Sequence, residues 1–401
     1  MTDLKIKRLF KRLLLLFFIL LVISVFFGVE QRTASAYSAE EEAALEELEQ
    51  YVKDLLGELD TEDLQKYLDS FSDYEGGNIK DKLLSVITGD FALDYSSLTK
   101  SIVSLVWDEA KIMLPAFAVI LAVALLCGIL NSVKNSFLNN TMTDIINFVG
   151  YIAVGAVVLA SLIGVLEAGF SAIGNMKRQM EIVYPILLTL MAASGGSVSA
   201  GVYRPAVAFM SSAITELFTT IVLPTSIIVI VLAFIGNLSN DVRTEKLGDL
   251  FKSVNKWLIG LSLGLFSLFL TIQGITSAQY DGLSLRAMKY VISGSVPIVG
   301  GFLSGGLELV IAGSAIIKNA IGSFAVFMLF GTLLRPLMLI VVFQLFLRLS
   351  AAATEPVGGK ISSFLSRVAT DSGYFLAGLL CIAFLYFLTL ILLICSTGVI
   401  I

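Results

Sequence analysis

Long apolar segments follow one another from residue 111 to the end of the chain. Charged or polar interruptions separate eight of them, at 112–130, 145–166, 183–203, 205–235, 257–277, 290–316, 320–347 and 374–400. A helix needs roughly 20 apolar residues to cross the hydrocarbon core of a membrane. A backbone in lipid must also satisfy its own hydrogen bonds, which favours helices. The pattern therefore predicts an all-α, polytopic membrane domain over 111–401, with about six to eight transmembrane or re-entrant segments.

Two of these segments are unusually rich in glycine. Each begins with a Pro-Ile pair, at Pro185 and at Pro297, and reaches a Gly-Gly pair soon afterwards. Small residues let helices pack closely, or let a segment re-enter without crossing. The similarity of the two segments also suggests an internal repeat, as in secondary transporters. The glycines concerned are Gly195, Gly196, Gly300, Gly301, Gly305 and Gly306.

The N-terminal residues 1–36 have the pattern of a signal peptide. Basic residues precede an apolar stretch at 13–27, and Ala34-Ser35-Ala36 is typical of a cleavage site. The alternative is an uncleaved membrane anchor, because the apolar stretch is only slightly too short to span. In both cases the basic end stays in the cytoplasm and the following residues are exported.

Residues 37–110 form the part of the chain with the composition of a water-soluble domain. Acidic residues greatly outnumber basic ones there, and apolar residues recur at helical spacing. We expect a small, acidic, helical extracytoplasmic domain. Its apolar seam either docks on partner proteins or packs within the domain itself. The seam consists of Leu45, Leu48, Val52, Leu55 and Leu59.

Composition supports a membrane protein and excludes several kinds of chemistry. Of 401 residues, 57% are apolar and 15% are charged, whereas soluble domains are about a quarter charged. The chain has no histidine, which excludes a Ser-His-Asp triad and a histidine-ligated zinc. The three cysteines lack metal-binding spacing, and no phosphate-binding loop is present. We therefore expect no enzymatic activity, no cofactor, no metal site and no binding to nucleic acid.

Three ionisable residues lie within the apolar segments, where charge is costly and usually functional. They are Glu216, Glu308 and Arg335. An acid and the arginine could pair within the bundle, or these residues could line a wet path for ions or a polar solute. A further alternative is that the segment boundaries are misplaced.

Four stretches together resemble the stage III sporulation protein AE family of endospore-forming bacteria. They are Cys127-Gly128-Ile129-Leu130 with Ser136-Phe137, Tyr184-Pro185 with Leu190 to Gly196, Ser295 to Gly301, and Lys318-Asn319-Ala320-Ile321-Gly322. The order of signal segment, acidic exported region and polytopic domain resembles the family too.

The resemblance implies a permease-like membrane subunit of a secretion-like channel complex that links the mother cell and the forespore. It implies the mother-cell membrane as location, with residues 37–110 in the intermembrane space, and a requirement in forespore development after engulfment. The expected partners are the lipid bilayer, a motor ATPase, ring-forming proteins, small membrane proteins and further copies of the chain. The alternative, suggested by the repeat and the three ionisable residues, is a free-standing secondary transporter for a small solute.

Overall fold

The computed structural model describes residues 50–59, 61–69, 78–88, 95–137, 140–238, 244–269, 300–356 and 359–396. Within these ranges the structure is helical and contains no strand, which confirms the predicted all-α class. Residues 50–58 and 245–269 are helical. The other elements are α3 (Glu62–Asp69), α4 (Ile79–Thr88), α5 (Tyr95–Phe137), α6 (Asn140–Ala193), α7 (Ser197–Phe209), η1 (Met210–Ile214), α8 (Thr215–Leu217), η2 (Phe218–Val222), α9 (Leu223–Leu238), α11 (Gly300–Thr354) and α12 (Gly359–Cys395).

Within the described residues, the helices are longer than the apolar pattern suggested. Helix α6 has 54 residues and α11 has 55, which corresponds to about 80 Å each. Helix α11 joins the described part of 290–316 to 320–347 without a break. The polar interruptions do not end helices because they are accommodated on helical surfaces. In α6, for example, Lys177 and Glu181 lie one turn apart with Nζ and Oε1 separated by 3.8 Å.

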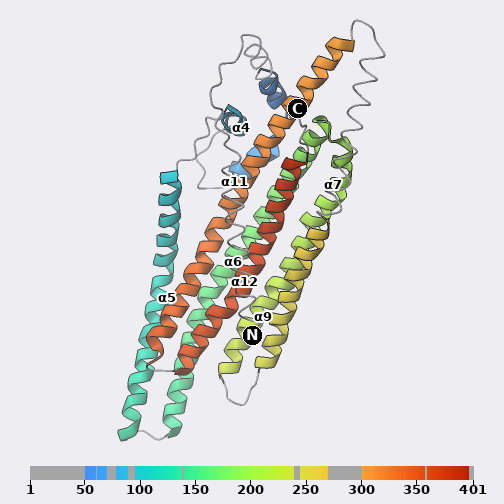
Figure 1. The fold of residues 1–401 in the computed structure, drawn as a ribbon. Coiled ribbons are helices and arrows are strands. Elements are labelled where there is room, and N and C mark those ends of the chain that lie inside the picture. The colour runs from blue at the N-terminus through green and yellow to red at the C-terminus, as the bar shows by residue number, and fades with distance from the viewer. Residues whose placement is uncertain are drawn as a thin grey trace.

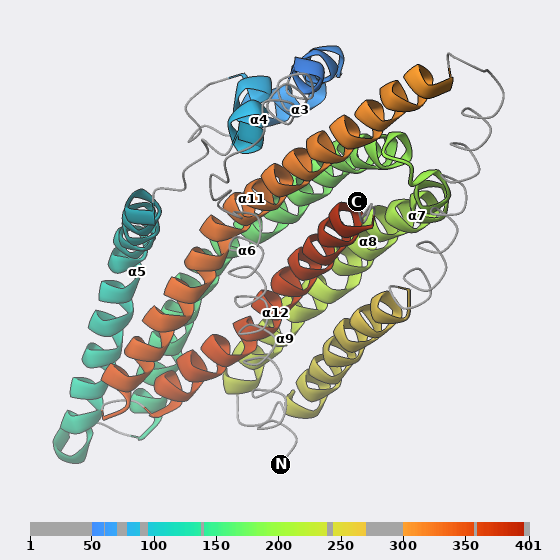
Figure 2. The ribbon, with the colours of Figure 1, turned by 45° about the horizontal axis from the view of Figure 1, so that its top comes forward.

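The long helices lie side by side in an elongated bundle (Figure 1). The connections α5–α6, α9 to 245–269, and α11–α12 lie toward the same end, and the turn between α6 and α7 lies at the other (Figures 1 and 2). Helix α12 is the central element. Among its described side chains only Ser363, Ser366, Thr370 and Cys395 are exposed.

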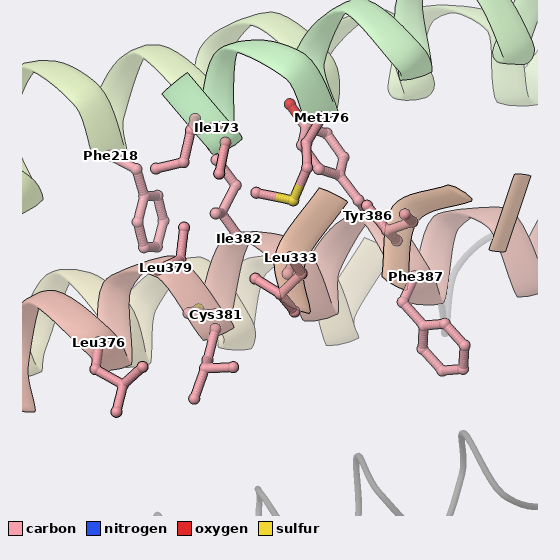
Figure 3. Close-up of a cluster of buried hydrophobic side chains, with 14 of the residues drawn as sticks. Ile173, Met176, Phe218, Leu333, Leu376, Leu379, Cys381, Ile382, Tyr386 and Phe387 are labelled. Atoms are coloured by element: carbon pink, nitrogen blue, oxygen red, sulfur yellow. The ribbon is translucent and has the colours of Figure 1, made fainter. Parts of the chain in front are cut away.

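The core forms where α12 meets α6, η2 and α11 (Figure 3). Ile173 and Met176 of α6, Phe218 of η2 and Leu379 of α12 are all fully buried there. Five described helical stretches are long and apolar enough to cross a membrane, which confirms the predicted membrane character. They are Val103–Cys127, Phe148–Ala193, Ser197–Gly236, Leu309–Thr354 and Ile361–Cys395.

The two glycine-rich segments have different structures. The first, predicted as a segment over 183–203, is the end of α6, a turn at Ser194-Gly195-Gly196 and the start of α7. The amide of Gly196 donates to the carbonyl of Met191 over 2.9 Å, and Gly195 has a positive φ of 92°, as in a helix C-cap. In contrast, Gly305 and Gly306 lie inside helix α11. The two Gly-Gly pairs of the suggested repeat are therefore not structurally equivalent.

The turn predicts a specific cost for a side chain at residue 195. Gly195→Ala should lower the stability of the protein by about 1 kcal/mol, because a Cβ is strained at positive φ. Thermal unfolding in detergent would measure this. The matched control is Gly164→Ala, within helix α6, where nothing lies within 4 Å of an added Cβ. This control should be neutral or stabilising, and equal losses at both positions would contradict the assignment.

Candidate functional site

The N-terminal helices pack against the bundle. The hydroxyl of Tyr67 on α3 donates to the carbonyl of Asn175 on α6 over 3.0 Å. Burial raises the pKa of Tyr67 to about 12, so the phenol stays protonated and can donate even at alkaline pH. Val52 is also buried, and the ring of Tyr51 would lie 3.0 Å from a Cβ added at Gly313 of α11. These helices are thus fixed along α6 and α11.

The predicted apolar seam contributes to this packing. Val52 is 1% exposed, and Leu55 and Leu59 are half-buried and contact the same core. Leu45 and Leu48 lie outside the described residues. The described part of the seam therefore contacts the chain's own bundle, and a partner would have to displace the bundle to reach it.

The structure places Glu109 of α5 beside Arg335 of α11. The Arg335 Nε lies 3.3 Å from the Glu109 Oε1. The carboxylate is 6% exposed and the guanidinium is 68% exposed. Sequence reasoning missed this partner because Glu109 precedes the boundary drawn at residue 110, whereas α5 continues through that boundary.

The two predicted acids have different surroundings. Glu308 lies in α11, but its side chain is outside the described ones. Glu216 is exposed and accepts a hydrogen bond from the Thr220 hydroxyl over 2.8 Å. Of the predicted residues, Arg335 thus contacts an acid that was not anticipated, and Glu216 contacts a neighbouring threonine.

Glu216 lies between two π-helical segments, η1 and η2. Such wide turns are rare and often occur at functional sites. Ser212, Glu216 and Thr220 are exposed along this part of the run. The adjacent Thr215 is buried and contacts the hydroxyl of Tyr386 on the central helix. The result is a polar outer face directly beside a buried polar contact.

A second group of charges ties 245–269 to α12. The Lys252 Nζ lies 2.8 Å from the Asp371 Oδ1, and the Asp371 side chain is 3% exposed. Arg367 and Glu245 form a more exposed pair at 3.2 Å. The sequence offered one signal for this group, because Asp371 is the only acidic residue after Glu355.

Lys318 has a structural role at the end of α12. Its ammonium group is fully buried and donates to the carbonyl of Ile394 over 2.9 Å. A cation at this position satisfies a terminal carbonyl and favours the negative end of the helix dipole. Gly322, one turn further along α11, faces the Ile394 side chain so closely that a Cβ would clash. The stretch Lys318 to Gly322 is thus a close helix–helix contact.

Comparison with known proteins identifies the family. The family model for stage III sporulation protein AE matches residues 78–398. The chain belongs to the stage III sporulation protein AE family. A relative of that name from Bacillus subtilis (strain 168) is 23% identical over 367 residues, which cover 90% of this chain and 92% of the relative. No solved structure matches the chain.

Membership of the stage III sporulation protein AE family confirms the resemblance recognised from the four stretches. All four lie within the matched residues. In the described parts of these stretches, the structure gives them packing roles: the Gly195-Gly196 turn and the contact at Lys318 and Gly322 hold long helices together.

The buried ion pair predicts an asymmetric response to substitution. Asp371→Ala should destabilise the protein by about 3 kcal/mol, because Lys252 would lose its partner in a largely buried position. Glu245→Ala is the matched control, since the Arg367–Glu245 pair is more exposed and should be worth less than about 1 kcal/mol. Thermal unfolding in detergent would compare them.

Combining Asp371→Leu with Lys252→Met should restore most of the lost stability, because no unpaired charge remains. If Asp371→Ala were as harmless as Glu245→Ala, the pair would not be a stabilising contact.

Proposed function

We propose that this protein is the non-enzymatic, permease-like membrane subunit of a channel complex that links the mother cell and the forespore. Its family membership supports a role in sporulation. The observation that carries the finer proposal is the length of α6 and α11, 54 and 55 residues. Helices of about 80 Å exceed the thickness of one bilayer, as suits a component that extends from one membrane toward another.

The charges at the helix connections favour one orientation. At the end of the bundle with the α5–α6, α9 to 245–269 and α11–α12 connections, the described basic residues include Lys134, Lys246 and Lys360. Basic residues near membrane segments favour the cytoplasmic side. With that end in the mother-cell cytoplasm, residues 37–110 and the end of α12 face the intermembrane space. This agrees with the exported character of the acidic region.

Within this proposal the partners are a motor ATPase, ring-forming proteins, smaller membrane proteins and further copies of the chain. Glu216 is the best candidate of the predicted residues for a pathway or a subunit contact, because its side chain is exposed between two π-helical segments. Arg335 is already engaged with Glu109.

Deletion of the gene tests the proposal. The deletion strain should grow normally, complete engulfment and then fail in forespore development, with loss of late forespore transcription measured by a reporter. Normal sporulation of the deletion strain would refute the function. Transport of a solute by the purified protein alone in liposomes would instead support a free-standing transporter.

Glu216→Gln tests the role of this residue within the same assay. It should reduce reporter activity toward the deletion level without changing the amount of protein on an immunoblot, because only a charge is removed. Glu181→Gln is the control, since Glu181 is equally an exposed helical acid and should behave as wild type. Equal activity in both variants would exclude a role for the Glu216 charge.

A further inference from the structure

The exposed side chains of α6 change character at Glu167. Before it, the helix exposes the large apolar residues Ile145, Phe148, Val149, Ile152 and Ile163. From Glu167 to Ala193, no exposed side chain of α6 is a large apolar one. The exposed residues there are Glu167, Ser171, Gly174, Arg178, Glu181, Pro185, Thr189, Ala192 and Ala193.

Helix α11 changes in the same way. Between residues 309 and 340, its exposed side chains are Asn319, Ser323, Gly331 and Arg335. The following turns expose Val341, Leu345 and Leu349, together with Arg348. Since α11 runs antiparallel to α6, both helices carry their apolar surface in the same half of the bundle.

The change occurs at a common level on three helices. One small cavity is lined by Phe117 of α5, Ser161 of α6 and Phe343 of α11, which fixes their register. The Glu109–Arg335 pair lies eight residues before Phe117 on α5 and eight residues before Phe343 on α11. On α6, Glu167 lies six residues after Ser161. Trp107 is 64% exposed at this level, with the Lys111 Nζ 5.7 Å from its ring centroid. Tryptophan and charged residues of this kind are typical of a membrane interface.

The helix 245–269 has matching features at the same level, because Tyr374 of α12 is next to Phe375, whose ring lies against Gly169 of α6. Trp257, in the helix 245–269, is 68% exposed, and its neighbour Lys256 lies over the ring of Tyr374 at 5.6 Å. Along α5, the distance from Glu109 to Lys134 is about 38 Å, at 1.5 Å per residue. A hydrocarbon core of about 30 Å fits between Glu109 and Lys134.

We infer that the bilayer surrounds only the half of the bundle nearer the α5–α6 connection, and that the other half stands in water. Lipid acyl chains contact the half nearer the α5–α6 connection, called the lower half, because its exposed surface is apolar and is bordered by tryptophan and charged residues. The upper part of α6, residues 168–193, then extends about 40 Å beyond the membrane. Helix α3 packs on its side, where Tyr67 donates to the carbonyl of Asn175. This inference does not depend on the proposed function.

The inference also explains why an exposed acid is tolerated at residue 216. The exposed apolar residues that follow Glu216 in the same run are Ile221, Ile228, Val231 and Ile235. Glu216 therefore lies at the edge of the lipid-facing belt, where its carboxylate can reach water. Exposed apolar side chains outside the belt are interspersed with polar or small ones. They are Val103 and Val106 on α5, Val198, Val202 and Phe209 on α7, and Leu261, Leu265 and Leu268 on the helix 245–269.

Cysteine labelling on a single helix face tests the boundary. In full-length protein with Cys395→Ser, Cys127 and Cys381 are buried, and this parent protein gives the background. Ser171→Cys and Thr189→Cys lie on the water-exposed side of the boundary at Glu167, and Ala156→Cys and Ala160→Cys lie on the lipid-exposed side. All four positions are exposed on α6, and each replaces a small side chain with cysteine. A polar, membrane-impermeant maleimide is applied to membranes opened by freezing and thawing, so that both surfaces are accessible.

Residues 171 and 189 should react at least about tenfold faster than 156 and 160, because a thiol in hydrocarbon does not ionise. Residues 156 and 160 should react only after solubilisation and denaturation. Equal rates at all four positions, or reaction at 156 and 160 with none at 171 and 189, would overturn the inference. Repeating the labelling on sealed, right-side-out vesicles then reports on which side of the membrane the upper half lies.

Discussion

The structure depends on the antiparallel packing of α6 against α11 along most of their length. Neither helix could keep about 80 Å of apolar stripe in place alone, because most helix stability comes from packing an apolar face. Polar contacts fix the register of the pair. The Gln179 amide nitrogen donates to the carbonyl of Ala325 over 2.6 Å, and both residues are buried. A one-turn slip would leave this buried donor unpaired, which is costly.

Helix α12 adapts to this pair and to the run from α7 to α9. Gly378 lets α12 approach Val222 and Leu223. About two turns further along α12, Tyr386 contacts Thr215. Two π-helical segments lie in this stretch. Because a π-turn holds more residues than an α-turn, it rotates the following side chains. Thr215 is buried against α12, and its neighbour Glu216, about 100° further round the helix, is exposed. The position of the acid is therefore a consequence of how this run fits the central helix.

The sequence was sufficient for the properties that depend on local composition. The all-α class and the membrane character follow from apolar length. Gly195 and Gly196 were predicted as packing or re-entrant residues, whereas the structure places them in the turn that ends α6. The sequence was insufficient where contacts join distant residues. Arg335 and Glu109 are 226 positions apart, and the acid was assigned to the exported region. Lys318 was assigned no role because it lies between two predicted segments, and nothing in the sequence indicates that the carbonyl of Ile394 will accept its hydrogen bond. Segment ends were also unreliable, since charges on a helix surface interrupt hydropathy without interrupting the helix.

The shape of the bundle argues for a subunit over a free-standing transporter. Secondary transporters commonly form a site near the bilayer midplane from broken helices. Within the described residues of α6 to α9, the helical break at residues 194–196 is at the end of the bundle, far from the apolar belt. Gly305 and Gly306, which were the other candidates for a break, continue helix α11. The charges with identified partners, such as Lys318 and Asp371, are engaged within the fold. Helices longer than one bilayer is thick are better suited to positioning other proteins than to moving a solute alone.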